Sequence, residues 1–331
     1  MKYGLIGETL GHSVSPYIHK LYGNDDYVLK NIPHNEVVDF IKSKNYLGLN
    51  VTIPYKETVL PLCDEISPGA KKIGSVNTLI LRSDNTLYGE NTDLFGFIYM
   101  AKKANISFQD KKVIILGTGG TGKMAKVAAT EMKAREIVQI SRNGDITYED
   151  KEKYLDGDIL VNTTPVGMYP NNGKQLVDLQ EFSNLKGVLD VVYNPLRTAL
   201  VLQAEDLKIP HTGGLTMLTE QARYAGELFL HKKIPQAMGD EACKKMRQKL
   251  ANIIIVNSER IAASLGKELN REVITQGNWE EIAKEKSLIL SVSKKDAEIY
   301  YNTFRQNGVL FPAGTIKRDT AATVEAILRS L

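Results

Sequence analysis

Short apolar runs alternate with more polar segments along most of this chain of 331 residues. The first third contains three strand-like runs and one segment with helical spacing, namely YGLIG (3–7), YVLKNI (27–32), LGLNVTI (47–53) and EVVDFIK (36–42). Two further strand-like runs, 76–81 and 86–91, flank the turn-forming residues 83–85 and predict a β-hairpin. This part of the chain is therefore predicted to be a small α/β domain.

A more regular pattern follows a helical run at 93–103. Four runs rich in β-branched residues are separated by segments of helix length, namely KKVIILG (111–117), EIVQIS (136–141), DILVNTT (158–164) and GVLDVVY (187–193). This spacing is typical of a parallel, doubly wound sheet. Helices are predicted next at 219–230 and from 236 to about 250.

The pattern starts again with the apolar run ANIIIV (251–256), which predicts another buried strand followed by a helix. A chain of this length is expected to hold two or three domains. The prediction is an α/β protein with three parts: an α/β domain at 1–104, completed by helices from about 219–249, a Rossmann-like domain at 105–218, and a small α/β module at 250–331.

Composition and charge remove several classes of function. Hydrophobic residues make up 43% and charged residues 24%, which is ordinary for a globular protein, and the net charge of +3 gives no reason to expect a nucleic-acid partner. Cys63 and Cys243 lie far apart without metal-ligand spacing, so neither disulfides nor a metal site is expected. The first apolar run is too short for a signal peptide and no segment reaches the length of a membrane span. A cytoplasmic protein is the expectation.

A glycine-rich loop is the first chemical signal. The sequence VIILGTGGTGK carries G-x-G-x-x-G at Gly117, Gly119 and Gly122, between a predicted strand and a predicted helix. The first glycine permits a tight turn, the second lets the backbone approach a pyrophosphate, and the third lets the helix pack on the strand. The loop predicts dinucleotide binding; the alternative is a tight glycine turn that binds nothing.

The end of the next strand bears on the choice of cofactor. NAD sites usually place a carboxylate there for the ribose 2′-hydroxyl, whereas this chain has Ser141 and Arg142 and no carboxylate before Asp145. A guanidinium can pair with a 2′-phosphate, so NADP is favoured. The alternative for Arg142 is a solvated surface charge.

Polar residues follow several of the predicted strands of the first domain. GHSVSP (11–16) follows the first strand, NVTIPYK (50–56) delivers Lys56 after a strand broken by Pro54, and Asp93 lies at the mouth of a helix. If these loops share one rim of the sheet, a lysine beside a carboxylate is a plausible acid/base pair for alcohol or ketone chemistry. Taken singly, these features also have simpler explanations: turn chemistry, a surface charge at Lys56, a helix N-cap at Asp93 and a turn former at Asn77.

Eight segments taken together resemble those of shikimate dehydrogenases, in the same order. They are GHSVSPYIHK (11–20), NVTIPYK (50–56), IGSVNT (73–78), GENTDLFGF (89–97), LGTGGTGK (116–123), VNTTPVGM (161–168), DVVYNPLRTAL (190–200) and GGLTMLTEQA (213–222). The resemblance covers about residues 1–250. It implies an oxidoreductase of aromatic amino-acid biosynthesis that reduces 3-dehydroshikimate to shikimate with NADPH.

The resemblance also implies roles for particular residues. Lys56 and Asp93 would be the catalytic pair, with Lys56 protonating the oxygen that forms at C3, while Ser13 and Ser15 would bond the shikimate carboxylate. The implied substrate-binding residues are Ser13, Ser15, Thr52, Lys56, Asn77, Asp93, Tyr193 and Gln221. The implied NADP-binding residues are Gly117, Thr118, Gly119, Gly120, Thr121, Ser141, Arg142, Thr163, Val191, Gly214 and Met217.

The chain departs from the family pattern in two places. Its phosphate loop reads GTGGTG where the family usually has G-A-G-G-A-[AS], and Ser141-Arg142-Asn143 stands where Asn-Arg-Thr is usual. Two other functions stay open: a quinate/shikimate dehydrogenase of broader specificity, and a cofactor-binding regulator without activity. A monomer or a homodimer, with a small-molecule substrate and no nucleic-acid or membrane partner, is expected.

The last 80 or so residues resemble a shikimate kinase in three segments, 251–274, 287–314 and the closing 324–331. The residues needed for ATP chemistry are absent, however. NSER (257–260) stands where a glycine-rich phosphate loop should be, and TQGN (275–278) and SVSKKD (291–296) replace other kinase motifs. We expect a degenerate kinase-like module without ATP chemistry; the alternative is an unrelated α/β extension.

Overall fold

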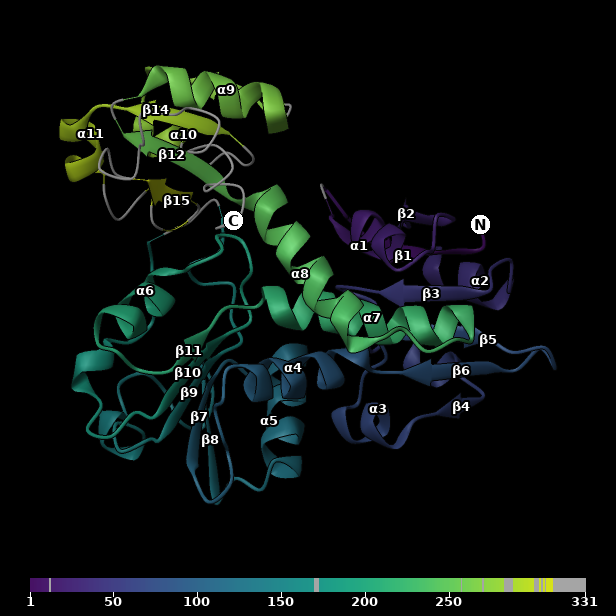
Figure 1. Ribbon diagram of the computed structural model, residues 1–331. Helices are drawn as coiled ribbons and strands as arrows, with labels where there is room; N and C mark the ends of the chain where they lie inside the picture. The colour runs from purple at the N-terminus through teal and green to yellow at the C-terminus, as the bar shows by residue number, and fades with distance from the viewer. Residues whose placement is uncertain are drawn as a thin grey trace.

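The computed structural model describes residues 1–11, 13–169, 173–256, 258–269, 271–282, 288–300, 304, 306 and 308–311. Within these residues the chain forms three β-sheets of six, five and four strands, each in a different part of the sequence. Figure 1 shows the first sheet at one side of the molecule, the second at the other, and the third above the second. The α/β class predicted from the sequence is therefore correct.

The first sheet is mixed, with the strand order β2-β1-β3-β5-β6-β4. Its strands are β1 (Tyr3–Gly7), β2 (Tyr27–Asn31), β3 (Gly48–Val51), β4 (Glu65–Ile66), β5 (Thr78–Leu81) and β6 (Leu87–Glu90). β1 pairs in parallel with β2 and β3, whereas β5 runs antiparallel to β3 and β6, which is the predicted hairpin. Helices α1 (Ser15–Leu21), α2 (Val37–Lys42) and α3 (Pro68–Ile73) and the 3₁₀ helix η1 (Leu60–Leu62) join the strands.

The two faces of this sheet are covered by different parts of the chain, because side chains along a strand point alternately to opposite faces. From β1, Ile6 packs into a core with Ile41 of α2. Leu5 points to the other face, where it packs against a cluster that contains Phe229. Phe229 belongs to helix α7 (Leu215–Leu230), more than 200 residues later in the chain. The first domain is therefore completed only by a distant segment.

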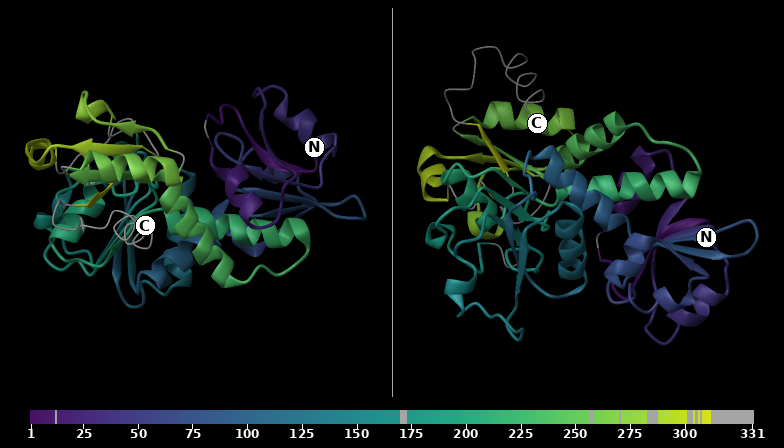
Figure 2. Two further views of the ribbon diagram at one scale, coloured as in Figure 1. Left: turned by 45° about the horizontal axis from the view of Figure 1, so that its top comes forward. Right: turned by 90° about the horizontal axis from the view of Figure 1, so that it is seen from below.

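Three helices join the sheets along the chain, one from the first sheet to the second and two from the second sheet to the third. They are α4 (Thr92–Lys103), α7 (Leu215–Leu230) and α8 (Gln236–Leu250). The views of Figure 2 agree with Figure 1 in placing α8 as the connection from α7 to the C-terminal sheet. Helix α7 begins four residues before the predicted start because Gly214, not a later residue, is its N-cap.

The second sheet is wholly parallel, with the strand order β11-β10-β9-β7-β8. Its strands are β7 (Lys112–Leu116), β8 (Glu136–Ile140), β9 (Ile159–Asn162), β10 (Gly187–Asp190) and β11 (His211–Thr212). Helices α5 (Gly120–Glu131) and α6 (Ala199–Asp206) and the 3₁₀ helices η2 (Lys151–Lys153) and η3 (Leu179–Glu181) join them. The strand order reverses between β7 and β9, and ligands of doubly wound sheets bind at such a switch point.

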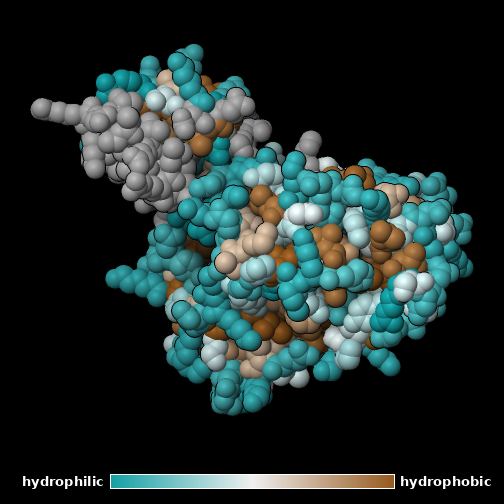
Figure 3. Space-filling model, turned by 45° about the vertical axis from the view of Figure 1, so that its right-hand side comes forward, coloured by the Kyte–Doolittle hydropathy of each residue, from teal (hydrophilic) through white to brown (hydrophobic). Residues whose placement is uncertain are grey.

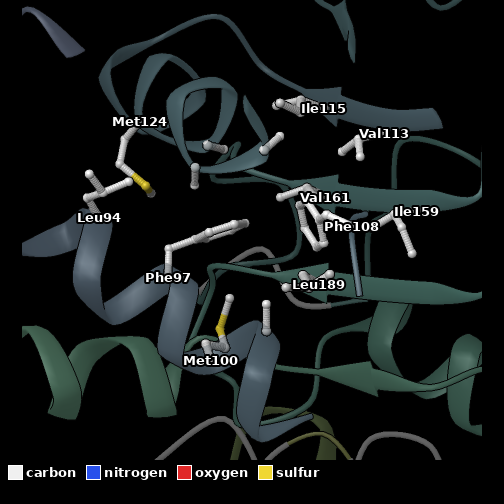
Figure 4. Packing of buried hydrophobic residues seen from close by; sticks show 14 of the residues in the cluster. Leu94, Phe97, Met100, Phe108, Val113, Ile115, Met124, Ile159, Val161 and Leu189 are labelled. Carbon is white, nitrogen blue, oxygen red and sulfur yellow. The ribbon is translucent and has the colours of Figure 1, made fainter. Parts of the chain in front are cut away.

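Strand β7 shows why this sheet is buried on both faces. Val113 and Ile115 pack into one core and Ile114 and Leu116 into another, so residues 113–116 all face apolar neighbours. In Figure 4, Phe97 of α4 points toward the strand side chains from below α5. A continuous β-branched run, rather than an alternating one, is what such a two-sided environment requires.

The third sheet is also parallel, with the order β13-β14-β12-β15. It contains β12 (Asn252–Val256), β13 (Val273–Ile274), β14 (Ile289–Val292) and β15 (Gly308–Phe311), with helices α9 (Glu259–Leu269), α10 (Trp279–Ile282) and α11 (Lys294–Ile299). The predicted strand and helix after residue 250 are present as β12 and α9. The segment 324–331, which resembles the closing segment of a shikimate kinase, lies outside the described residues.

This C-terminal part is tied to the rest of the chain by two sets of hydrogen bonds. The guanidinium of Arg271 donates to the carbonyls of Ala251, at 2.9 Å, and Gln248, at the end of α8. The backbone N–H of Arg197 donates to the carbonyl of Gln306 at 3.0 Å. In both contacts residues 1–251 supply only backbone groups. The contacts therefore depend little on the side chains of those residues.

The surface is hydrophilic with several separate apolar patches on the face seen in Figure 3. Among the described residues, no helix combines the length and the apolar character needed to span a bilayer.

Candidate active site

Two cavities adjoin, one lined by residues from the parts of the chain that form the first and second sheets, and the other lined only by residues between 117 and 176. We call them the lysine cavity, of about 360 Å³, and the arginine cavity, of about 700 Å³, after Lys56 and Arg142. They meet at the glycine-rich loop, since Gly119 lines one and Gly120 the other. Both cavities therefore open on the switch point of the parallel sheet.

All the residues implied by the resemblance line one cavity or the other. The lysine cavity collects Ser13, Ser15, Thr52, Lys56, Asn77, Asp93, Tyr193 and Gln221, together with Gly120, Thr121, Val191, Gly214 and Met217. The arginine cavity collects Gly117, Thr118, Gly119, Ser141, Arg142 and Thr163. Residues between Ser13 and Gln221 are thus brought together around two adjoining cavities.

Lys56 and Asp93 form an ion pair in the wall of the lysine cavity. Lys56 Nζ lies 2.6 Å from Asp93 Oδ2, and the two side chains are 24% and 19% exposed. Lys56 follows β3 beyond Pro54, and Asp93 lies in the first turn of α4, whose N-cap is Asn91 rather than Asp93. An ammonium held by a carboxylate in a partly closed site is suited to proton transfer.

The two serines after β1 are arranged as donors. Ser13 Oγ donates to Ser15 Oγ at 3.1 Å and accepts from the backbone N–H of Ser15 at 3.3 Å. Because Ser15 Oγ already accepts a proton from Ser13, its own hydroxyl proton is available to the cavity. A carboxylate, which only accepts, is a fitting partner for this group.

A buried carboxylate holds the loop that carries Val191 and Tyr193. Asp190 accepts hydrogen bonds from Val192 N at 3.0 Å and from Thr198 Oγ1 at 2.6 Å. Burial raises the pKa of Asp190 to about 6, and these hydrogen bonds offset part of that shift. Burial also raises the pKa of the Tyr193 phenol, which therefore stays protonated at neutral pH.

The glycine-rich loop has the geometry that a pyrophosphate requires. Gly117 has φ +109°, which favours glycine, and a Cβ on Gly122 would lie 2.3 Å from the Gly117 carbonyl oxygen. Helix α5 begins at Gly120, so its unpaired N–H groups face the junction of the two cavities. The loop therefore fits a bound dinucleotide, with phosphates at the start of α5.

Arg142 lies in the wall of the arginine cavity just after β8 (Glu136–Ile140). Among the described residues it makes no ion pair with a carboxylate, so its charge is available to a ligand. The Tyr148 phenol lies near it: burial raises the pKa of Tyr148, and the Arg142 charge opposes that shift. A cation without an acidic partner fits the 2′-phosphate of NADP better than the 2′-hydroxyl of NAD.

Two ion pairs join helix α5 to the first domain across the cleft. Lys123 Nζ lies 2.7 Å from Glu57 Oε1, and Lys72 Nζ lies 3.3 Å from Glu131 Oε1. All four side chains are at least one-third exposed, so each pair contributes little to stability. They still connect the residue after Lys56 to the helix that begins at the nucleotide loop.

Several cavity residues were not predicted from the sequence. Leu5, Tyr27, Asn50 and Leu218 line the lysine cavity, and Tyr148, Met168 and Lys174 line the arginine cavity. Asn50 is the first residue of the motif NVTIPYK, four residues before Pro54. This position in the motif is a sequence signal that could have identified Asn50 as a site residue. No local signal marks Tyr27 or Tyr148, whose places depend on tertiary packing.

No group of three or more His, Cys, Asp or Glu residues able to hold a metal ion occurs within the described part of the chain. A parallel doubly wound sheet, a dinucleotide loop and an adjacent lysine–carboxylate pair define the class of pyridine-nucleotide oxidoreductases.

A family model described as the shikimate dehydrogenase substrate binding domain matches residues 5–79. The shikimate dehydrogenase (NADP⁺) of Clostridium perfringens strain 13 is 34% identical over 266 residues, which cover 74% of this chain and 98% of that protein. This chain belongs to the shikimate dehydrogenase family.

Solved structures agree with this assignment. The crystal structure of a chorismate mutase/shikimate 5-dehydrogenase fusion protein from Clostridium acetobutylicum matches with a TM-score of 0.70 and 34% identity, covering 74% of this chain and 97% of that one. Shikimate 5-dehydrogenase from Thermus thermophilus, in complex with NADP(H) and shikimate, matches with a TM-score of 0.65 and 26% identity, covering 74% and 99%.

Proposed function

We propose that this protein is an NADP-dependent shikimate dehydrogenase, which reversibly reduces 3-dehydroshikimate to shikimate on the way to chorismate and the aromatic amino acids. The observation that carries the proposal is the ion pair between Lys56 and Asp93, which lies in the same cavity wall as Gly120 and Thr121 of the dinucleotide loop. Proton transfer and hydride transfer are thereby brought to one space.

Each substrate contact follows from the chemistry of a cavity residue. The hydroxyls of Ser13 and Ser15 bind the carboxylate of the substrate, because they present donors to an acceptor-only group. Asn77, Thr52, Tyr193 and Gln221 supply the remaining polar contacts, and Asp93 holds both Lys56 and a ring hydroxyl in register. These roles match the family pattern at each position.

The chain's own part in the reaction is a proton transfer. When bound, NADPH supplies the hydride that reduces the C3 carbonyl. Lys56, as an ammonium, donates a proton to the C3 oxygen, and in the reverse direction it accepts that proton from the C3 hydroxyl. Asp93, 2.6 Å from Lys56 Nζ, orients the ammonium and stabilises its charge. Arg142 binds the 2′-phosphate, and residues 117–121 bind the pyrophosphate.

We further propose three functional parts with the boundaries predicted above. Residues 1–104, with about 219–249, form the substrate-binding domain, 105–218 form the NADP domain, and 250–331 form a degenerate kinase-like module. The separate sheets and the packing of α7 on the first sheet support this division. The parallel order β13-β14-β12-β15 and the absence of glycine between β12 and α9 support a module that kept an α/β core without ATP chemistry.

One assay tests the main proposal. Purified protein is mixed with shikimate and either NADP or NAD, and the absorbance of the reduced cofactor is followed. Rapid turnover with NADP is expected. Comparable turnover of quinate would instead support the broader-specificity enzyme, and binding of NADP without turnover would support an inactive regulator. A cytoplasmic location and a monomeric or dimeric state stay predictions; size-exclusion chromatography tests the second.

A further inference from the structure

A buried network of hydrogen bonds lies behind the lysine cavity and ends on two of its amides, Asn77 and Gln221. We propose that Thr78 and Thr92, which do not line the cavity, are positioning residues that make both amides present N–H donors to the substrate. The inference rests on the proposed function, because it concerns how the ring hydroxyls of shikimate are recognised. Both threonine side chains are fully buried, with 0% exposure.

The orientation of the Asn77 amide is set by a backbone group. The N–H of Thr92 can only donate, and it lies 2.7 Å from Asn77 Oδ1. Asn77 Oδ1 must therefore face Thr92. Asn77 itself lines the cavity, and its Nδ2 is not among the buried polar atoms that lack a partner. The N–H₂ group of Asn77 is thus turned toward the cavity.

Thr78 reinforces this orientation because the direction of each hydrogen bond determines the next. Thr78 Oγ1 lies 3.0 Å from Asn77 Oδ1 and must donate its only proton to that acceptor. Thr78 Oγ1 therefore accepts from Asn50 Nδ2, at 2.9 Å. The Asn50 Oδ1 atom then faces Tyr27 and accepts from its phenol at 2.8 Å. The network runs in one direction, from Tyr27 to Asn77.

A second backbone group sets the orientation of Gln221. Its Nε2 donates to the carbonyl of Leu218 at 3.0 Å, so its Oε1 faces Thr92. The Thr92 hydroxyl lies 3.1 Å from that oxygen and 3.2 Å from Asn77 Oδ1, so its single proton is shared between the two amide oxygens. One proton on Gln221 Nε2 remains available to the cavity, as do the protons on Asn77 Nδ2.

Two donors facing the cavity constrain the substrate. A hydroxyl oxygen next to Asn77 or Gln221 must accept a hydrogen bond and pass its own proton to another acceptor, for which the Asp93 carboxylate is placed in the same wall. A site whose polar groups are oriented for a hydroxyl rejects an analogue that lacks it, because those groups are then left without partners. Thr78 and Thr92 therefore act on specificity without touching the substrate.

The variant Thr78→Val tests this role, since valine keeps the volume and removes the hydroxyl. We expect kcat/KM for shikimate to fall about 10- to 100-fold, the factor for losing one oriented hydrogen bond, mainly through KM. Thr78→Ser, which restores the hydroxyl, is the matched control and should remain within a few-fold of wild type. KM for NADP should not change.

Analogues of shikimate that each lack one ring hydroxyl separate positioning from simple destabilisation. Wild type should discriminate strongly against the analogue that cannot pair with Asn77. Thr78→Val keeps the Thr92 N–H on Asn77 Oδ1 but loses the Thr78 hydroxyl, so it should lose part of that discrimination. If Thr78→Val does not fold, Thr92→Val replaces it. This variant keeps the backbone N–H to Asn77 but loses the hydroxyl contacts to Gln221 and Asn77, so discrimination should fall more at the hydroxyl facing Gln221 than at the one facing Asn77.

Unchanged discrimination in a folded, less stable Thr78→Val protein would overturn the inference and leave Thr78 a packing residue. Wild type that fails to turn over or bind shikimate would instead contradict the proposed function itself, and the inference with it. The two failures are distinguishable because the second appears before any variant is made.

Discussion

Lys56 Nζ and Asp93 Oδ2 lie 2.6 Å apart although 37 residues separate them, because β3 and α4 end and begin at the same rim of the first sheet. The pair is partly shielded, with less than a quarter of each side chain exposed. Neither residue needs to move far to share a proton with a ligand bound beside the pair.

This relationship predicts the effect of removing the ammonium. Lys56→Ala should lower kcat by about 10²- to 10⁴-fold, the range for losing a general acid or base, while shikimate still binds. Steady-state rates and equilibrium binding measure the two effects separately. Lys123→Ala, which removes a nearby lysine paired with Glu57, is the control and should keep most of the activity. Near-normal turnover of Lys56→Ala would remove Lys56 from the mechanism.

Cofactor choice is predicted to depend on Arg142. Arg142→Ala should weaken NADP use by about 1.5–3 kcal/mol, the cost of losing a hydrogen bond to a charged group, and should leave NAD use nearly unchanged. Ratios of kcat/KM for the two cofactors provide the measurement. Arg135→Ala is a matched control, since Arg135 directly precedes β8 (Glu136–Ile140) and its side chain is 63% exposed. Equal losses for both cofactors would make Arg142 a structural residue.

The C-terminal module is predicted to be dispensable for dehydrogenase chemistry. A chain ending after Ala251 should keep kcat within a few-fold, since every residue that lines the lysine cavity precedes that point. Its thermal midpoint or association state should change, because Leu250 and Ala251 are buried in the full chain and become exposed at the new end. Activity assays and size-exclusion chromatography test both parts.

The full chain is expected to show neither ATP-dependent phosphorylation of shikimate nor ATP binding in the low micromolar range. Titration calorimetry with Mg-ATP tests binding, and a kinase assay tests chemistry. Saturable ATP use would contradict the degenerate-module proposal. A folded but inactive truncation would show instead that the module helps to build the dehydrogenase site. In that case Arg271→Ala, which removes the hydrogen bonds from the module to the end of α8, should reproduce part of the loss of activity.

His19 predicts a specific dependence of stability on pH. It stacks on Tyr27 with 3.8 Å between ring centroids and lies near Phe229 and Asn50. Neither ring nitrogen has a hydrogen-bond partner in the part of the chain that the structure describes. Burial lowers the pKa of His19 to about 3, and the Asn50 side chain opposes this only in part. The unfolded chain, with a pKa near 6.5, therefore binds a proton that the folded protein excludes.

The stability contributed by neutral His19 is complete above pH 6.5 and is lost as the pH falls toward 3. Between pH 7.5 and 5.5 the free energy of unfolding should drop by about 1.4 kcal/mol from this residue alone. His19→Phe keeps the stacked ring but cannot titrate, so its loss over the same interval should be smaller by that amount. Asp190, whose raised pKa has the opposite effect, is common to both proteins and cancels. Identical acid dependence in urea unfolding would contradict the prediction.

Most of the fold could be predicted from apolar periodicity. The run 3–7 was predicted as a strand and is β1 (Tyr3–Gly7), and the helix predicted from 236 to about 250 is α8 (Gln236–Leu250). The strands β4 and β11 were missed because two residues show no period at all. Their places follow from pairing with β6 and β10, which depends on the assembled sheet.

The sequence indicates the site residues that stand out within motifs. It does not indicate the residues whose role depends on their tertiary packing. Lys56 and Arg142 stand at strand ends, where polar residues are conspicuous. Thr78 and Thr92, by contrast, lie inside the quoted segments IGSVNT and GENTDLFGF and look like ordinary strand and helix-start residues. Their importance comes from hydrogen bonds to Asn77 and Gln221, and Gln221 is 129 residues from Thr92.

The distant position of α7 also constrains how the protein is made. Ribosomes add about 5–20 residues per second, so the first sheet is synthesised many seconds before Phe229 and Gln221 emerge. During that interval Leu5 has no covering helix, while the intervening parallel sheet can already form. The NADP domain should therefore fold first on the ribosome. The substrate-binding domain should complete its fold only after α7 has left the ribosome.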